Sequence, residues 1–192
     1  MVTVSLPTPD NFEKYPKGLR EKATAMWVLG AGALIAPCAK YAIAEALKRF
    51  GIDKDDVEFV ETDTETFALH AEEGDIDLLQ VIKLAAQLWP SGKELTKAAN
   101  IVRSVEWASC NYGSSGGPAT VFMALVWAEV TGEPIDACFD ITEIAEALDL
   151  STGLREMNML GRWLQLFSDL PRPYRLLVAE AVGAIEDAYQ WI

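Results

Sequence analysis

The chain has 192 residues, of which 51% are hydrophobic, and it carries 16 Lys and Arg against 29 Asp and Glu, a net charge of −13. A chain of this composition is not disordered, and it is long enough for one domain with a proper core. The excess of negative charge disfavours nucleic acid and anionic membranes as partners and leaves a basic protein as an option. We therefore expect a single domain over residues 1–192.

The three cysteines, Cys38, Cys110 and Cys138, are widely spaced and form no Cys-x-x-Cys pair. An odd number of scattered cysteines predicts thiols in a cytoplasmic protein instead of a disulfide framework. His70 is the single histidine, so we expect no zinc site and no di-iron bundle. The two glycines within residues 30–32 lack the preceding strand and the third glycine of a dinucleotide-binding loop, so we expect no cofactor either.

Residues 2–6 alternate apolar and polar side chains, which predicts a short strand. Residues 57–61 could form a second strand, and the two together would make a minor two-stranded β ribbon beside the helices. Asp63 or Thr64 can cap a short helix that ends at Glu73.

Residues 23–39 carry no charge and are the one candidate for a membrane span. The run barely reaches the minimum spanning length of about 17 residues, and Pro37 and two glycines interrupt it. We therefore expect no membrane span and interpret the small residues as a place where another helix approaches closely. Further helices are expected over residues 41–50, 76–89 and 91–109.

The stretch from Gly116 to Gly132 is apolar, with Glu129 as its single charge. Pro118 suits a first helical turn, and Gly132 suits a helix end. A helix that is apolar on every side should run through the middle of the core. With more helices expected over residues 141–148 and 151–167 and from residue 171 onward, the sequence predicts an all-α fold.

The loop over residues 110–118 leads into this apolar helix. Its Gly-Ser-Ser-Gly-Gly-Pro sequence resembles the Gly-Asp-Ser-Gly-Gly-Pro sequence around the nucleophile of trypsin-like serine proteases. The resemblance implies Ser115 as nucleophile and His70 as base, with Ser114 in the place of the family's Asp. A thiol version would use Cys110 with His70. Those proteases are double β-barrels and this pattern is helical, so a small cysteine or serine hydrolase is kept as an alternative.

Residues 140–164 resemble a helix-turn-helix, because the small Ala145, with Ile144 and Leu148 packed inward, is the pattern of its first helix. Asp149 stands where the turn usually has glycine, and the second helix offers Arg155 against Glu156 and no basic cluster for phosphates. A transcriptional regulator with a degenerate helix-turn-helix is therefore a second alternative, and the charge makes nucleic acid a poor partner.

The sequence lacks a coherent catalytic set and combines an acidic composition with six Trp and five Met residues. We interpret it as a non-enzymatic protein that acts through protein–protein interaction, as an accessory, adaptor, immunity or inhibitor protein, and that forms a homodimer. Its acidic surface could also imitate nucleic acid and block a protein that binds it. The candidate interaction surface consists of four apolar residues, Met157, Met159, Trp163 and Phe167.

Overall fold

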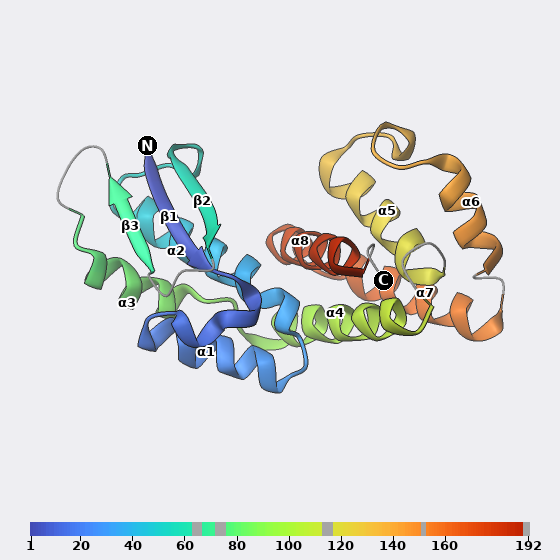
Figure 1. Ribbon diagram of the computed structural model, residues 1–192, viewed down its shortest axis with the longest axis horizontal. Helices are drawn as coiled ribbons and strands as arrows, with labels where there is room; N and C mark the ends of the chain where they lie inside the picture. Colours follow the sequence, from blue (N-terminus) through green and yellow to red (C-terminus); the bar gives the residue numbers. More distant parts are fainter. Residues whose placement is uncertain (63–66, 72–75, 113–116, 151–152, 190–192) are drawn as a thin grey trace. The chain divides into compact units, whose positions relative to one another are not determined.

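The computed structural model of the chain describes residues 1–62, 67–71, 76–112, 117–150 and 153–189. The chain divides into two compact units, Met1–Ser91 and Gly92–Ile192 (Figure 1). Helices dominate both units and the described strands form one small sheet, so the predicted all-α class is confirmed. That all 192 residues form a single domain stays a prediction.

The sheet of the first unit has three strands, β1 (Val2–Pro7), β2 (Val57–Thr62) and β3 (Ala68–Ala71), in the order β2-β1-β3. The expected pairing of the first two strands is confirmed, and it is parallel, whereas β3 runs antiparallel to β1. The short helix expected to end at Glu73 is wrong over residues 68–71, which form β3. Backbone pairing with β1 outweighs the weak local preference of so short a segment for a helix.

The helices of the first unit pack beside this sheet. They are the α-helices α1 (Lys17–Val28), α2 (Ile35–Arg49) and α3 (Leu78–Leu88) and the short 3-10 helices η1 (Pro9–Lys14), η2 (Gly32–Leu34) and η3 (Lys54–Asp56). Val2, Val4 and Leu6, which alternate along β1, are buried, and α2 packs against α3, so the core lies between one sheet face and the helices.

The uncharged run of residues 23–39 is divided between two helices. Gly30 adopts a φ of 72° after the end of α1, and α2 begins at Ile35, which leaves Pro37 in a first turn where its missing N–H costs nothing. Within the described residues, no helix is both long enough and apolar enough to cross a membrane.

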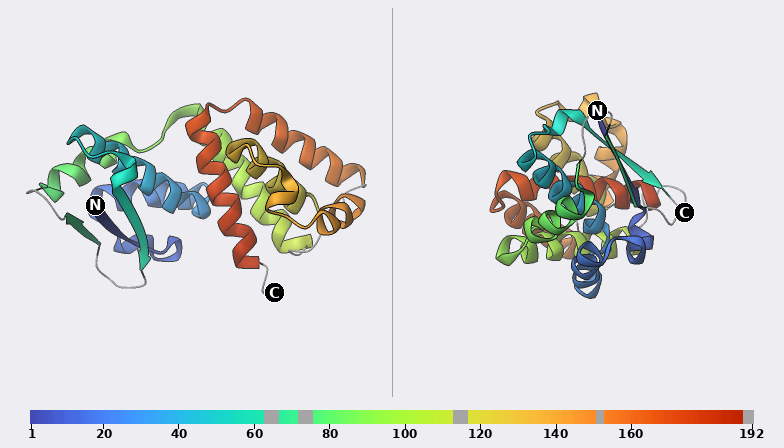
Figure 2. Two further views of the ribbon diagram at one scale, coloured as in Figure 1. Left: turned by 90° about the horizontal axis from the view of Figure 1, so that it is seen from above. Right: turned by 90° about the vertical axis from the view of Figure 1, so that its left-hand side faces the viewer.

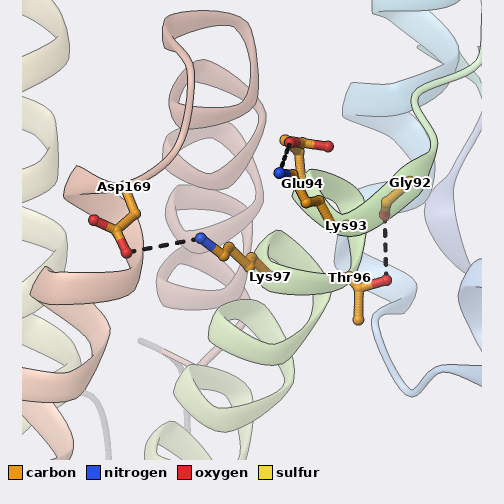
Figure 3. A network of polar contacts seen from close by, with 6 residues as sticks. All are labelled: Gly92, Lys93, Glu94, Thr96, Lys97 and Asp169. Atoms are coloured by element: carbon orange, nitrogen blue, oxygen red, sulfur yellow. Dashed lines mark hydrogen bonds and ion pairs between the residues drawn. The ribbon is translucent and has the colours of Figure 1, made fainter.

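The second unit consists of helices. They are α4 (Gly92–Tyr112), α5 (Pro118–Thr131), the 3-10 helix η4 (Ile135–Ala137), α6 (Ile141–Leu150), α7 (Leu154–Ser168) and α8 (Arg172–Tyr189). Helix α4 packs along α8 and also contacts α7, while α5 contacts α6, α7 and α8 (Figure 2). At the start of α4, Lys97 Nζ lies 3.7 Å from Asp169 Oδ2, which follows α7 (Figure 3).

Helix α5 confirms the predicted helix and its ends, because Pro118 is its first residue and Gly132 caps it in the left-handed conformation. Its first turns are buried, but Trp127 is 40% exposed, so the expectation that this helix is covered on every side is wrong in its second half. Glu129, its single charge, pairs with Arg175 of α8. Because this carboxylate lies on an outer face beside a cation, it does not have to be buried in the core.

Exchanging Gly132 for alanine is expected to destabilise the protein by about 1–2 kcal/mol, because a Cβ is strained at its φ of 76°. Open space surrounds that Cβ position, so the cost is strain and not a clash. The matched control is Gly161→Ala inside α7, where space is also open and alanine should stabilise by about 0.5–1 kcal/mol. Thermal unfolding should move in opposite directions for the two variants; a shift in the same direction would contradict this account.

Candidate functional site

The residues of the hydrolase interpretation lie in different parts of the chain. His70 is exposed on β3 in the first unit, and Cys110 is exposed near the end of α4 in the second. Ser115 lies outside the described residues. The C-terminal end of a helix is the wrong end to stabilise a thiolate, so α4 offers Cys110 no activation. No described geometry brings these groups together, and the hydrolase stays an untested alternative.

Two residues of the candidate interaction surface belong to the core of the second unit. The buried rings of Trp163 and Phe167 meet the Phe122 ring edge-on, with centroid distances of 5.5 and 6.0 Å. The Trp163 Nε1–H also donates to Ser104 Oγ at 2.9 Å. Their inclusion in an exposed patch is therefore wrong, because a spacing of four residues places both on the inner side of α7.

The two methionines of that candidate surface differ from this pair. Met157 is 59% exposed, and Met159 is partly buried. Of the four predicted residues, Met157 is thus the one whose side chain is largely open to solvent.

The helix pair expected within residues 140–164 is present as α6 and α7. Both helices pack against α5, and Leu148, which the helix-turn-helix interpretation expects to pack inward, is half exposed. The Arg155 guanidinium lies 5.1 Å from the centroid of the Trp107 ring on α4, so it stacks on its own chain. Helix α6 carries several carboxylates, so the surface formed by α6 and α7 repels phosphates. DNA binding stays an untested alternative with unfavourable charge.

Helix α6 is the most exposed helix of the second unit. Its N-cap is Asp140, whose Oδ1 accepts from the Thr142 N–H at 2.7 Å. Among its described side chains, Ala147 is buried and Ile144 partly buried, and these face α5. Two large apolar side chains, Ile141 and Leu148, stay 55% and 49% exposed. An amphipathic helix normally buries such residues, so α6 has an apolar side that is about half open to solvent.

The exposed apolar residues of α6 form one line. Ile141, Ala145 and Leu148 follow each other at steps of four and three residues, which places them on one side of a helix. We call these three residues the α6 stripe. At about 100° per residue, Asp149 lies next to the stripe on the side away from α5, whereas Glu146 lies about 100° or more around the helix from each residue of the stripe. Both of these carboxylates are exposed.

The surroundings of the α6 stripe are acidic because a long segment of the chain lacks cations. Between Arg103 and Arg155, residues 104–154 contain no Lys or Arg. The same segment contains eight acidic residues, Glu106, Glu129, Glu133, Asp136, Asp140, Glu143, Glu146 and Asp149. The totals of acidic and basic residues do not reveal this segment, although the missing cations can be read directly from the sequence.

In contrast to these exposed carboxylates, one carboxyl group of this unit is buried. Glu186 of α8 is 6% exposed. Burial, and after it the negative charges of Asp187 and Glu143, together raise the pKa of its carboxyl to about 7. Near neutral pH this group therefore carries a proton in part of the molecules.

Among the described residues, these groups do not converge on a metal site. Within the described ranges, no cluster of three or more His, Cys, Asp and Glu side chains has a geometry that could hold a metal ion. The α6 stripe and the acidic segment around it are thus the features from which a function can be argued. Comparisons of the chain with family models, with curated proteins and with solved structures found no match.

Proposed function

We propose that this chain is a non-enzymatic protein that works by binding a basic protein, and that the Gly92–Ile192 unit provides the contact surface. The observation that carries the proposal is the absence of Lys and Arg from residues 104–154. Within this segment, the six carboxylates from Glu133 to Asp149 are all exposed. A net charge of −13 would favour basic partners anywhere on the surface, but this segment concentrates the effect.

The physical argument is one of electrostatic steering. Several like charges without intervening cations produce a potential that attracts a basic partner and raises its rate of association. The same potential discriminates against nucleic acid and anionic lipid. This charge distribution suits an adaptor or an inhibitor, because both act by occupying the surface of another protein. A partner that normally binds nucleic acid would fit as well, since carboxylates then take the place of phosphates.

The test isolates the full-length tagged protein gently from its own host and analyses it by native mass spectrometry. We expect a protein with a basic surface at fixed stoichiometry, and binding that weakens with salt. The variant Glu133→Gln/Asp136→Asn should bind less and lose part of the salt dependence. The matched control, Asp55→Asn/Asp56→Asn, removes two exposed charges from the first unit and should bind like the parent.

Two results would overturn this proposal. One is a chain that is recovered alone, or as its own oligomer, even at low ionic strength. The other is a partner whose binding responds equally to the two double variants, because the charge of residues 104–154 would then have no special part in recognition.

A further inference from the structure

We infer that the outer edge of β2 is a docking site for an extended segment of another protein, which alternates apolar and basic side chains and joins the sheet as an additional strand. The inference concerns the Met1–Ser91 unit and is independent of the proposed function, which rests on the other unit. Two features of β2 carry it, namely backbone groups without a partner and the side chains that lie beside them.

Strand β2 is paired on one of its two sides. Figure 1 shows β1 between β2 and β3, and β2 pairs with β1 in a parallel register that runs without interruption from Val57 to Thr62. For residues 58–61, the described part of the chain offers no backbone partner other than β1. Because the backbone groups of a strand point alternately to its two sides, about half of the N–H and C=O groups of these residues face outward.

These outward-facing backbone groups determine the shape of the molecule that can bind them. They recur along the strand at the spacing of a β-ladder, which another extended backbone matches and a helix does not. Proteins often block such an edge with Pro, Lys or a bulge. The sequence of β2, Val-Glu-Phe-Val-Glu-Thr, contains neither Pro nor Lys, and its one-to-one register with β1 leaves no bulge. The edge is therefore open to a further strand.

The two faces of β2 define the side chains of the docked segment. Phe59 pairs with the fully buried Val4, which places Phe59 and Val57 on the face of the sheet that packs against the helices. Both side chains are partly buried, and apolar residues of a neighbouring strand would cover them further. Glu58 lies between them in the sequence and is exposed on the opposite face.

The charge of β2 selects a basic segment. The strand contains two carboxylates and no Lys or Arg. Glu61 Oε1 lies 3.3 Å from Lys40 Nζ of α2, whereas Glu58 lies on the face turned away from the helices. A Lys or Arg directly opposite Glu58 would form a favourable cross-strand pair, and an acidic residue there would be unfavourable. The complementary segment thus has a basic side chain between two apolar ones.

A second copy of this chain is a poorer occupant of the edge. Pairing of β2 with the β2 of another copy would bring two carboxylates from each copy into strands that contain no Lys or Arg. Like charges on neighbouring strands cost free energy, and the net charge of −13 on each copy adds to the repulsion. The homodimer expected from the sequence would therefore use another surface.

The first experiment uses the full-length protein and a synthetic peptide of about seven residues in which Lys alternates with Val. Binding is measured by fluorescence anisotropy, and the contact is located by amide hydrogen exchange followed by NMR. We expect saturable, salt-sensitive binding and slower exchange of backbone amides within residues 58–61. The same peptide with N-methylated interior residues keeps its side chains and charge but cannot donate backbone hydrogen bonds, so it should bind about tenfold more weakly or less.

An exchange of charge then tests the role of Glu58. Glu58→Lys should weaken the Lys peptide about threefold to tenfold, and it should bind the same peptide with Glu in place of Lys more tightly than the parent does. The matched control is Glu21→Lys, an exposed glutamate of α1 in the same unit, which should leave both affinities unchanged. Both positions are exposed, so circular dichroism and the unfolding temperature should stay close to those of the parent.

Four outcomes would overturn the inference. They are a Lys peptide that does not bind at low ionic strength, an N-methylated peptide that binds as tightly as the unmodified one, protection of amides that lie outside β2, and protection of the β2 amides by self-association, which would assign the edge to a second copy. None of these outcomes bears on the proposed function, because its test uses a partner isolated from the host and charges of the other unit.

Discussion

Replacing Phe122 by alanine is expected to lower the free energy of unfolding by about 3–5 kcal/mol. Phe122 has no solvent exposure, and its ring meets both Trp163 and Phe167, so this contact joins α5 to α7. Removal of the ring would leave a cavity bounded by the two remaining aromatic rings, which the Trp163 hydrogen bond to Ser104 holds in place. Urea denaturation followed by circular dichroism measures the change.

The control for this prediction is Phe50→Ala in the first unit. Phe50 is 42% exposed at the end of α2, so its loss should cost about 1 kcal/mol, well below the cost at Phe122. Equal losses at the two positions would contradict the role of the aromatic cluster in the stability of the second unit.

A rise in pH from about 4.5 to about 7 is expected to make the protein less stable through Glu186. The folded protein holds the proton on this carboxyl up to a pKa of about 7, whereas the unfolded chain releases it near 4.5. Because the folded state binds more protons over this interval, stability falls as pH rises. At about 1.4 kcal/mol per pKa unit, the loss amounts to at most about 3 kcal/mol.

The variant Glu186→Gln tests this expectation, because it keeps the shape of the side chain and cannot ionise. Its stability should exceed that of the parent protein above neutral pH and approach it below the lower pKa. Glu180→Gln, an exposed position on the same helix, serves as the control and should leave the pH dependence unchanged. A parent-like pH dependence in Glu186→Gln would show that another group is responsible.

The elements that could be predicted from the sequence are those whose ends depend on local chemistry. Helix α5 begins at Pro118 and ends before Gly132 because a first-turn proline and a left-handed glycine determine backbone conformation without help from the rest of the fold. Strand β3 was missed because its backbone partner, β1, lies far away in the sequence. No local signal in residues 68–71 reports that partner.

The candidate site shows the same division between local and distant information. Asp140 caps α6 through its own side chain, which depends only on residues next to it in the sequence. Whether an apolar residue is buried or exposed depends on which other elements pack against its helix. For this reason Trp163 is buried, whereas Ile141 is exposed. Composition alone could not make that distinction, since both residues fit a helical apolar pattern. The missing cations over residues 104–154 were visible in the sequence, but their relevance depends on the exposure of α6.

The parallel pairing of β1 with β2 has a consequence for the way the chain is synthesised. Val2 pairs with Val57, and the central strand β1 has both of its neighbours later in the sequence. A ribosome adds about 5–20 residues per second, so β1 waits roughly 3–10 seconds before β2 has been made. During that time β1, whose Val4 and Leu6 are fully buried in the folded protein, has no strand with which to form backbone hydrogen bonds. We expect nascent chains that stop before Val57 to bind chaperones that recognise apolar strands, and chains that extend beyond Ala71 to release them.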